Sequence, residues 1–288
     1  MSSYNPPTAI VPFKPSDIIK EHYTLIQQIG AGSYGAIFEA VYQKDNVSKH
    51  VAIKFEKITL DKPVLCNEII ILKALTGNKH FARFYQYGTH ERYKFIAMEL
   101  LGPSLIDIVN RKRPYRFCLH SILKFGVQAI DAIQALHKAG FVHRDIKPSN
   151  FVIGNKVESS SRIYLIDFGL CKKLNMKDGI IVKPSMKGSF RGTVRYASVN
   201  AHDKKELGRQ DDLMSLIYIF VEFYTGSLPW LNIDDPDEVM LLKEHYQCGS
   251  LMLKMPPEFM QFEDHILSLE YTTEPDYQLL TSILYRIA

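Results

Sequence analysis

A run of eight residues, HRDIKPSN at 143–150, carries groups that could do chemistry together. Asp145 offers a carboxylate that could orient or accept a hydroxyl proton, and Lys147 offers an ammonium group that could neutralise a transferring phosphoryl group. Asn150 offers an amide oxygen that could bind a metal ion. The histidine and arginine before Asp145 are expected to support the loop, with the histidine structural. Taken alone, these residues also fit a charged surface turn.

Apolar pairs flank this loop at residues 141–142 and 151–152, and they predict short β segments that hold it rigidly. A second candidate group follows in IDFGL, residues 166–170. There Asp167 stands at the end of the apolar run IYLI and could bind Mg²⁺. Gly169 permits a sharp turn after it, and a simple turn is the alternative for this motif alone.

A glycine-rich stretch, IGAGSYGAIF, lies near the start of the chain at residues 29–38. Gly30, Gly32 and Gly35 form the pattern G-x-G-x-x-G. Strand-like residues lie on both sides of it, whereas a dinucleotide-binding turn would open a helix. The pattern therefore favours a hairpin whose backbone amides cover phosphates, with a plain glycine-rich hairpin as the alternative.

The segment VAIK places Lys54 on a predicted strand, with Ala52 on the same face because side chains alternate along a strand. A partly buried ammonium group needs a partner. Glu68, which lies 14 residues further on in a predicted helix, could form an ion pair with Lys54 and direct it toward a ligand's phosphates. A lysine that faces solvent on an edge strand is the alternative.

The elements around these motifs change character near residues 100–103. The first region reads as a small antiparallel sheet with one helix, and the second as mainly helical, so we expect an α+β protein of two lobes with a cleft between them. We expect a flexible arm over 1–20, an N-terminal lobe over 21–101 and a C-terminal lobe over 102–288. The expected strands are 23–29, 36–43, 50–56, 83–89 and 94–100, and the expected helices are 64–75, 121–140, 204–225, 236–248 and parts of 257–285.

In this order and at these spacings, the motifs resemble the signature set of protein kinases. The resemblance implies a bilobal protein kinase fold and the use of ATP and Mg²⁺. It implies that Asn150 and Asp167 bind the metal and that Lys54, Glu68 and the 143–150 loop serve catalysis. Since Lys54, Asp145, Asn150 and Asp167 are all present, we expect an active enzyme; an ATP-binding scaffold without phosphotransfer is the alternative.

Further motifs narrow the resemblance. HRDIKPSN is similar to serine/threonine kinases, and FRGTVRYASVNAH at 190–202 lacks the Ala-Pro-Glu that most kinases carry. With MELLGPSL at 98–105 and GRQDDLMSL at 208–216, it resembles the casein kinase 1 family, most closely the tau-tubulin kinase branch. The resemblance runs from about Tyr23 to Leu284.

This resemblance assigns further residues. Met98 would be the gatekeeper, and backbone groups of Glu99 and Leu101 would bind adenine. Thr193 would hydrogen-bond Asp145 and Lys147, and Asp212 would anchor the catalytic loop. The apolar residues expected to enclose the adenine, for which ordinary core packing is the alternative, are Ile29, Ile37, Ala52, Val152 and Ile166.

The expected substrates are proteins with acidic or phosphorylated Ser/Thr sites, and the name of the branch adds a cytoskeletal substrate. Lys187, Arg191 and Arg195 suit an anionic substrate residue, although a solvated basic face would look the same. Acidic residues at 234–238 follow GSLPW, where family members often carry basic ones, and would repel a phosphorylated acceptor. We therefore expect a weaker dependence on prior phosphorylation of the substrate than is typical of the family.

Composition sets broader limits. The 288 residues, with 46% hydrophobic and 23% charged content, fit a globular protein, and a net charge of +4 does not imply nucleic-acid binding. The longest apolar run, residues 213–221, is about half a membrane span, and the N-terminus lacks a signal-peptide pattern. The four cysteines have no metal or disulfide spacing, so we expect a cytoplasmic or nuclear monomer. No obligatory phosphosite or long tail is evident, which favours constitutive activity.

Overall fold

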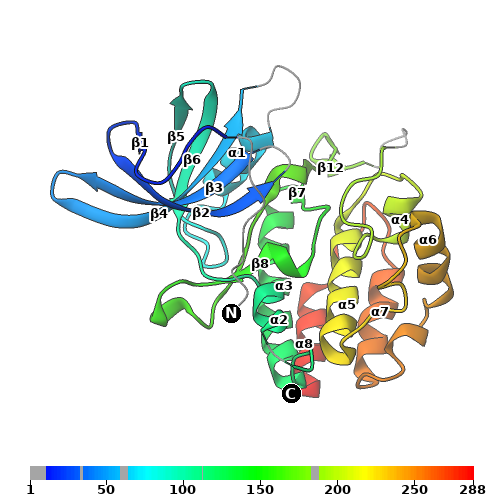
Figure 1. The fold of residues 1–288 in the computed structure, drawn as a ribbon. Helices are drawn as coiled ribbons and strands as arrows, with labels where there is room; N and C mark the ends of the chain where they lie inside the picture. The colour runs from blue at the N-terminus through cyan, green and yellow to red at the C-terminus, as the bar shows by residue number, and fades with distance from the viewer. Residues whose placement is uncertain (1–10, 33–34, 59–63, 112, 183–187) are drawn as a thin grey trace. The chain divides into compact units, whose positions relative to one another are not determined.

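The structure, a computed structural model, describes residues 11–32, 35–58, 64–111, 113–182 and 188–288. The chain divides into two compact units, Met1–Gly102 and Pro103–Ala288 (Figure 1).

The first unit is built on a curled antiparallel sheet of six strands in the order β1-β2-β3-β4-β6-β5. Its core is aromatic because alternate residues of the long strands point inward, and Phe38, Phe55 and Phe95 are at most 1% exposed. The described residues of the glycine-rich stretch lie on β2 and β3, which form an antiparallel pair, as the sequence predicts. The elements are β1 (Ile18–Ile19), β2 (Tyr23–Gly32), β3 (Gly35–Lys44), β4 (Val47–Lys57), α1 (Val64–Ala74), β5 (Phe84–His90) and β6 (Tyr93–Glu99).

The prediction of a flexible arm over residues 1–20 is wrong for its described part, residues 11–20. Phe13 is 9% exposed and packs its ring against Phe55 and Tyr93, with centroids 4.5 and 5.1 Å away. The short strand β1 pairs with the start of β2. Proline content suggested a loose arm, but a single buried aromatic ring and two paired residues attach this segment to the sheet. Residues 1–10 lie outside the described residues.

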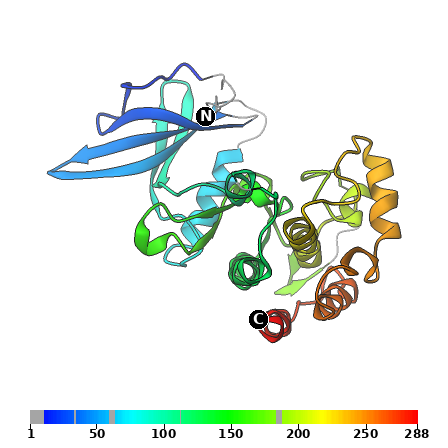
Figure 2. The same cartoon turned by 60° about the horizontal axis from the view of Figure 1, so that its bottom comes forward.

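The second unit is mainly helical, as predicted, and the α+β class is confirmed. Its longest helix, α3, packs against α5 and α8, and α7 packs against both of these (Figures 1 and 2). The helices are α2 (Leu105–Asn110), α3 (Leu119–Lys138), α4 (Val199–His202), α5 (Arg209–Thr225), α6 (Pro236–His245), α7 (Glu258–Leu267) and α8 (Tyr277–Ile287). The strands are β7 (Phe141–Val142), β8 (Phe151–Ile153), β9 (Ile163–Leu165), β10 (Lys172–Lys173), β11 (Met176–Lys177) and β12 (Ile180–Ile181).

Helix α5 contains the apolar run 213–221 and is buried on nearly all sides. It begins at Arg209 rather than at 204, because the Asp211 carboxylate accepts a hydrogen bond from the Gly208 amide and caps the first turn. Within the described part of the chain, no helix has the length and apolar content that crossing a membrane would need.

Candidate active site

Three side chains of the second unit form a closed set of contacts. Lys147 Nζ lies 2.6 Å from Asp145 Oδ2 and donates to Thr193 Oγ1 at 3.1 Å. The Thr193 hydroxyl donates in turn to Asp145 Oδ1 at 2.8 Å. The predicted contacts of Thr193 with Asp145 and Lys147 are therefore confirmed. Asp145 is 8% exposed, so its carboxylate is held in one orientation and not free in solvent.

Short strands hold the loop 143–150 on both sides, as predicted. β7 pairs with β10, and β8 pairs with β9 in register from Phe151–Leu165 to Ile153–Ile163. The Asn150 side chain closes the loop from within, because its Nδ2 donates to the Asp145 carbonyl at 2.8 Å. The loop is thus a rigid support for its polar groups.

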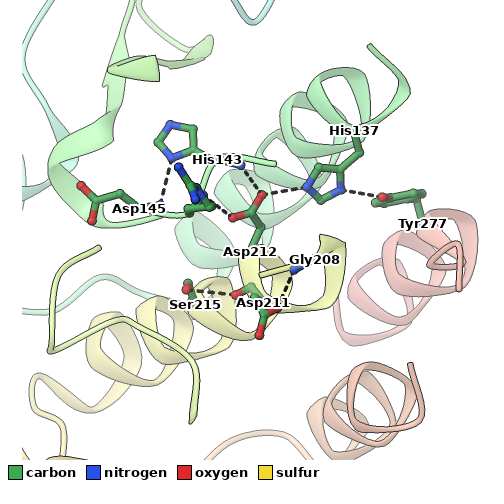
Figure 3. A network of polar contacts seen from close by, with 9 residues as sticks. His137, His143, Asp145, Gly208, Asp211, Asp212, Ser215 and Tyr277 are labelled. Carbon is green, nitrogen blue, oxygen red and sulfur yellow. Dashed lines mark hydrogen bonds and ion pairs between the residues drawn. The ribbon is translucent and has the colours of Figure 1, made fainter. Parts of the chain in front are cut away.

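Asp212, at the start of α5, is the hub that fixes the same loop (Figure 3). Its Oδ2 accepts the backbone N–H of His143 at 2.7 Å, and its Oδ1 accepts that of Arg144 at 2.8 Å. The predicted anchoring role of Asp212 is confirmed. Arg144 has φ +68°, a left-handed conformation that non-glycine residues rarely adopt, and these hydrogen bonds help to hold it there.

His137 and Tyr277 extend this hub to two further helices, and neither was predicted. His137 Nε2 lies 2.8 Å from Asp212 Oδ2, and its Nδ1 lies 2.6 Å from the Tyr277 hydroxyl on α8 (Figure 3). His137 is 4% exposed within α3. A histidine among the apolar positions of the predicted helix 121–140 was the available signal.

His143 is structural, as expected. Its Nδ1 accepts the Asp145 backbone N–H at 3.3 Å, and its Nε2 lies 3.1 Å from the Ile166 carbonyl. The ring thus connects the loop to the residue before Asp167.

A second anchor holds residues 193–200, which we call the 193–200 segment. The Asp211 carboxylate accepts hydrogen bonds from the Ser198 hydroxyl at 2.6 Å and from Asn200 Nδ2 at 2.9 Å. This gives a physical reason for Ser-x-Asn in place of Ala-Pro-Glu: both side chains are donors for one buried carboxylate. Gly192, at φ +107°, precedes the segment, and a Cβ there would lie 2.7 Å from the Arg144 carbonyl, so only glycine fits.

Asn150 and Asp167 are suitable ligands for a metal ion. Because Asn150 Nδ2 donates to a carbonyl, its Oδ1 is the atom left to ligate. Asp167 supplies a carboxylate at φ +65°, in the turn that follows β9. One or two such oxygen ligands plus substrate phosphates are the usual set for Mg²⁺, so the residues fit that ion.

The first unit contributes the predicted Lys54–Glu68 ion pair, with Nζ and Oε2 2.6 Å apart. Lys54 lies on β4 opposite Ile37 on β3, and Glu68 is buried on α1. The Glu56 carboxylate accepts the Leu65 backbone N–H at 2.6 Å and so favours the start of α1 where it begins. One strand therefore supplies the lysine and also fixes the helix that carries its partner.

The other predicted nucleotide-binding residues of this unit lie on β2, β3, β4 and β6 or just after them. Ala52 pairs with Met98 in the strand register. The Glu99 backbone N–H donates to the Arg83 carbonyl at 2.8 Å, and the Glu99 carboxylate accepts the Arg83 backbone N–H at 3.1 Å. A Cβ on Gly35 would lie 1.7 Å from the Phe55 carbonyl, so this glycine is required by close backbone approach. The predicted residues and their places are Ile29, Gly30 and Gly32 on β2, Gly35 and Ile37 on β3, Ala52 on β4, Met98 and Glu99 on β6, and Leu101 after it.

Val152 and Ile166 belong to the second unit, where Val152 lies on β8 and Ile166 directly follows β9. Ile166 is partly exposed and Val152 is buried. Their contact with a nucleotide stays a prediction.

A cavity of about 460 Å³ lies beside Lys147 and Thr193 within the second unit. Much of its lining is apolar, and the exposed Asp234 is one of its lining residues. The other lining residues include Ile106, Pro148, Val194, Arg195, Tyr196, Trp230, Leu231, Ile233 and Val239.

Comparison with known proteins agrees with this geometry. A model of the protein kinase domain matches residues 23–284. The chain belongs to the protein kinase family. Such domains in general use ATP with a divalent metal and act on protein substrates. The bilobal kinase fold predicted from the motifs is therefore confirmed.

Individual relatives indicate which group of protein kinases the chain resembles. The chain is 40% identical over 272 residues to a probable serine/threonine-protein kinase of Dictyostelium discoideum, covering 94% of this chain and 54% of that protein. It is 32% identical over 276 residues to casein kinase I homolog 2 of Schizosaccharomyces pombe, covering 93% and 63%. A putative serine/threonine-protein kinase of Caenorhabditis elegans is 33% identical over 272 residues, covering 93% and 78%.

These relatives confirm the resemblance to casein kinase 1 and to serine/threonine kinases. Placement in the tau-tubulin kinase branch stays a prediction. The chain spans about half to two thirds of the length of the first two relatives, 54% and 63%.

The predicted anion-binding residues of this kinase are not alike. Arg191 is exposed, whereas Arg195 Nη1 lies 3.5 Å from Glu222 Oε1, so an internal carboxylate already offsets part of its charge. Lys187 lies outside the described residues. A shared anion site for these residues stays a prediction.

Proposed function

We propose that this chain is an active serine/threonine protein kinase, which transfers the γ-phosphoryl group of ATP, with Mg²⁺, to Ser or Thr hydroxyls of proteins. The observation that carries the proposal is the closed set of contacts among Asp145, Lys147 and Thr193. The first two residues lie on the loop that Asp212 fixes through two backbone amides. Phosphoryl transfer depends mainly on positioning and charge stabilisation, and this arrangement supplies both.

In this proposal, Asp145 accepts a hydrogen bond from the substrate hydroxyl and takes its proton as the oxygen attacks phosphorus. Lys147, 2.6 Å from that carboxylate, places a positive charge beside the transferring group. The Thr193 hydroxyl is hydrogen-bonded to both side chains and fixes their positions relative to each other. Asn150 and Asp167 would hold the metal ion, which neutralises phosphate charge when bound. Lys54, oriented by Glu68, would contact the ATP phosphates.

The test separates chemistry from ATP binding. The wild-type chain, Asp145→Asn and Lys54→Met are compared on casein and on an unphosphorylated acidic Ser/Thr peptide, with ATP and Mg²⁺. We expect Asp145→Asn to lower kcat by roughly 10²–10⁴-fold while ATP still raises its Tm. We expect Lys54→Met to lose most of the ATP-dependent rise in Tm. Wild-type turnover by Asp145→Asn would overturn the assignment. An inactive wild-type chain that still binds ATP would favour a scaffold.

We also propose that substrates are acidic Ser/Thr sites that need little prior phosphorylation. Asp235, within the acidic residues at 234–238, caps α6 by accepting the Asp237 backbone N–H. This carboxylate therefore stabilises the start of the helix. Asp234 differs because it is exposed and lines the cavity beside Lys147, where it would repel a phosphate. Arg191 is exposed and is therefore better placed than Arg195 to attract an acidic side chain of the substrate.

A peptide pair tests this substrate proposal. A phosphorylated peptide that turns over about a hundredfold better than its unphosphorylated twin, equivalent to some 2.7 kcal/mol, would contradict it. Asp234→Asn should raise turnover of the phosphorylated peptide selectively. Glu238→Gln is the matched control, since it removes one exposed charge from the same run outside the cavity lining.

We further propose that the protein works as a monomer in a reducing compartment, the cytoplasm or the nucleus. The four cysteines, Cys66, Cys118, Cys171 and Cys248, lack the spacing of a disulfide framework or a CxxC metal site, and this spacing supports the compartment. Light scattering would test the mass, and imaging of the tagged full-length protein would test the location.

A further inference from the structure

Lys243 on α6 is a buried lysine whose described hydrogen-bond partners are neutral. It is 1% exposed, and its Nζ donates to the carbonyls of Val194 and Ala197, both at 2.6 Å. Its third neighbour is His202 Nε2, at 3.2 Å. An ammonium group has three N–H donors and no acceptor, so these three acceptors match it completely.

The surroundings explain how this amine can stay buried. Nζ lies 5.1 Å from the Tyr218 ring centroid and 5.3 Å from that of Trp230, so two aromatic faces cover it. Burial lowers the pKa of Lys243 to about 7, and that of His202 to about 4 with the neighbouring Lys243 adding to the effect. His202 is therefore a neutral acceptor near pH 7. A group that is so unfavourable to bury is expected to have a specific structural role.

The two carbonyls lie between the two anchors of the 193–200 segment. Val194 directly follows Thr193, which contacts Asp145 and Lys147. Ala197 directly precedes Ser198, which is bound to Asp211. Lys243 therefore holds the stretch that neither anchor reaches.

The same stretch lines the cavity beside Lys147. Val194, Arg195 and Tyr196 line it together with Trp230 and Val239. The Trp230 indole donates to the Arg195 carbonyl at 2.8 Å, so side chains hold three of the four carbonyls of residues 194–197. Val239 and Lys243 are four residues apart on α6 and share a face of that helix.

We infer that Lys243 is a positioning residue for substrate binding, which fixes residues 194–197 so that the cavity beside Lys147 is already formed when the substrate chain arrives. The inference rests on the proposed kinase function. The role is indirect: Lys243 acts through backbone carbonyls of the segment, and the substrate meets the segment. Preformed contacts lower the ordering cost of binding, so the effect falls on the substrate KM.

The test compares Lys243→Met, which removes the donors and keeps a long apolar stem, with Leu280→Ala. Leu280 is a fully buried residue of α8, and the control lowers stability without touching the segment. For Lys243→Met we expect the KM for the unphosphorylated peptide to rise about tenfold, or about 1.4 kcal/mol of binding free energy, with the KM for ATP unchanged. If both variants change kcat and both KM values alike, the role is only structural and the inference fails.

Hydrogen exchange gives a readout that does not depend on catalysis. In Lys243→Met the amides of residues 194–199 should exchange faster, while those of the 143–150 loop stay protected. Unchanged exchange at 194–199 would overturn the inference, even if the wild-type chain proved inactive and the proposed function failed. Lys243→Arg keeps the charge but has a planar set of donors. Lys243→Arg could restore the wild-type KM for the peptide while the amides of residues 194–199 still exchange fast. That result would show that the charge alone matters, and it would also overturn the inference.

Discussion

Two neighbouring carboxylates on α5 anchor different parts of the site, and their partners differ in kind. Asp212 holds the 143–150 loop through two backbone amides and is paired with the imidazole of His137. Asp211 holds the 193–200 segment through the neutral side chains of Ser198 and Asn200. Both carboxylates are at most 4% exposed, so the burial is similar and the partners make the difference.

The pKa values of the two groups shift in opposite directions. Burial raises the pKa of Asp211, and the hydrogen bonds from Ser198, Gly208 and Asn200 offset it only in part. Burial acts on Asp212 in the same sense, but the hydrogen bond and charge of His137, with the backbone hydrogen bond from His143, outweigh it and lower the pKa. The carboxylate that supports the candidate chemistry is thus stabilised as a charge.

This difference indicates how firmly each part is held. Ionised Asp212 fixes the loop whose groups must stay within hydrogen-bonding distance of one another. The 193–200 segment depends on a carboxylate whose charge burial disfavours, together with a lysine whose charge burial also disfavours. We therefore expect the 193–200 segment to open more readily than the 143–150 loop.

The largest effect should come from Asp212→Asn. An asparagine must direct its NH₂ at one of three donors that now share the carboxylate, and breaking a buried charged network costs about 3–5 kcal/mol. Urea unfolding followed by circular dichroism measures the loss of free energy of unfolding. A loss below about 1 kcal/mol, the size of an ordinary hydrogen bond, would show that Asp212 is not the central anchor.

Asp211→Asn should cost less, about 1–3 kcal/mol, because its partners are neutral and its ionised form is already disfavoured. Amide exchange should quicken around residues 198–201 and stay slow in the 143–150 loop. A loss equal to that of Asp212→Asn would remove the difference between the two anchors.

Sequence patterns predicted much of this site because short-range chemistry decides those parts. Alternation along the strands placed Ala52 and Lys54 on one face, and the β-rich flanks of the 143–150 loop predicted its rigid support. The Lys54–Glu68 pair was also predictable, since a partly buried ammonium group needs a carboxylate and one lay on the next helix.

The residues missed are those whose role depends on distant parts of the chain. His137 and Tyr277 meet although 140 positions separate them, and nothing local to either marks the contact. Lys243 lies in a helix that was predicted, yet its burial depends on carbonyls 46 and 49 positions away. The prediction of a flexible N-terminal arm was wrong because it relied on local composition. The prolines suggested a loose segment, whereas one aromatic ring, Phe13, packs its described part against the sheet.

The loss of free energy of unfolding should change with pH in opposite directions for Asp212→Asn and Asp211→Asn. The folded pKa of Asp212 lies below the unfolded value of about 3.9, so its contribution is present above that pH and is lost as pH falls through the folded pKa. The folded pKa of Asp211 lies above it, so its contribution falls as pH rises from about 3.9 to the folded pKa. The cost of Asp212→Asn should therefore grow with pH up to about 4, and that of Asp211→Asn should shrink above it.

Free energies of unfolding measured for both variants and the wild-type chain between about pH 3.5 and pH 6.5 check these signs, with differences on the order of 1 kcal/mol. The asparagine variants serve as non-titrating references for each other. Parallel pH profiles would mean that the two carboxylates are in equivalent electrostatic surroundings.

The smallest expected effect is the difference in stability cost between Ser198→Ala, at a buried anchor, and Ser104→Ala, at an ordinary helix cap. Ser198 and Ser104 are both N-caps that accept a backbone N–H at 3.3 Å and donate to a carboxylate at 2.6 Å. The Ser104 partner, Asp107, is exposed and can be rehydrated, whereas Asp211 is buried. Each change to alanine should cost about 1 kcal/mol for the cap, and Ser198→Ala about 1 kcal/mol more because Asp211 loses a donor away from water. Equal costs in urea unfolding would mean that Asn200 and Gly208 alone satisfy Asp211, and that the serine of Ser-x-Asn serves only as a cap.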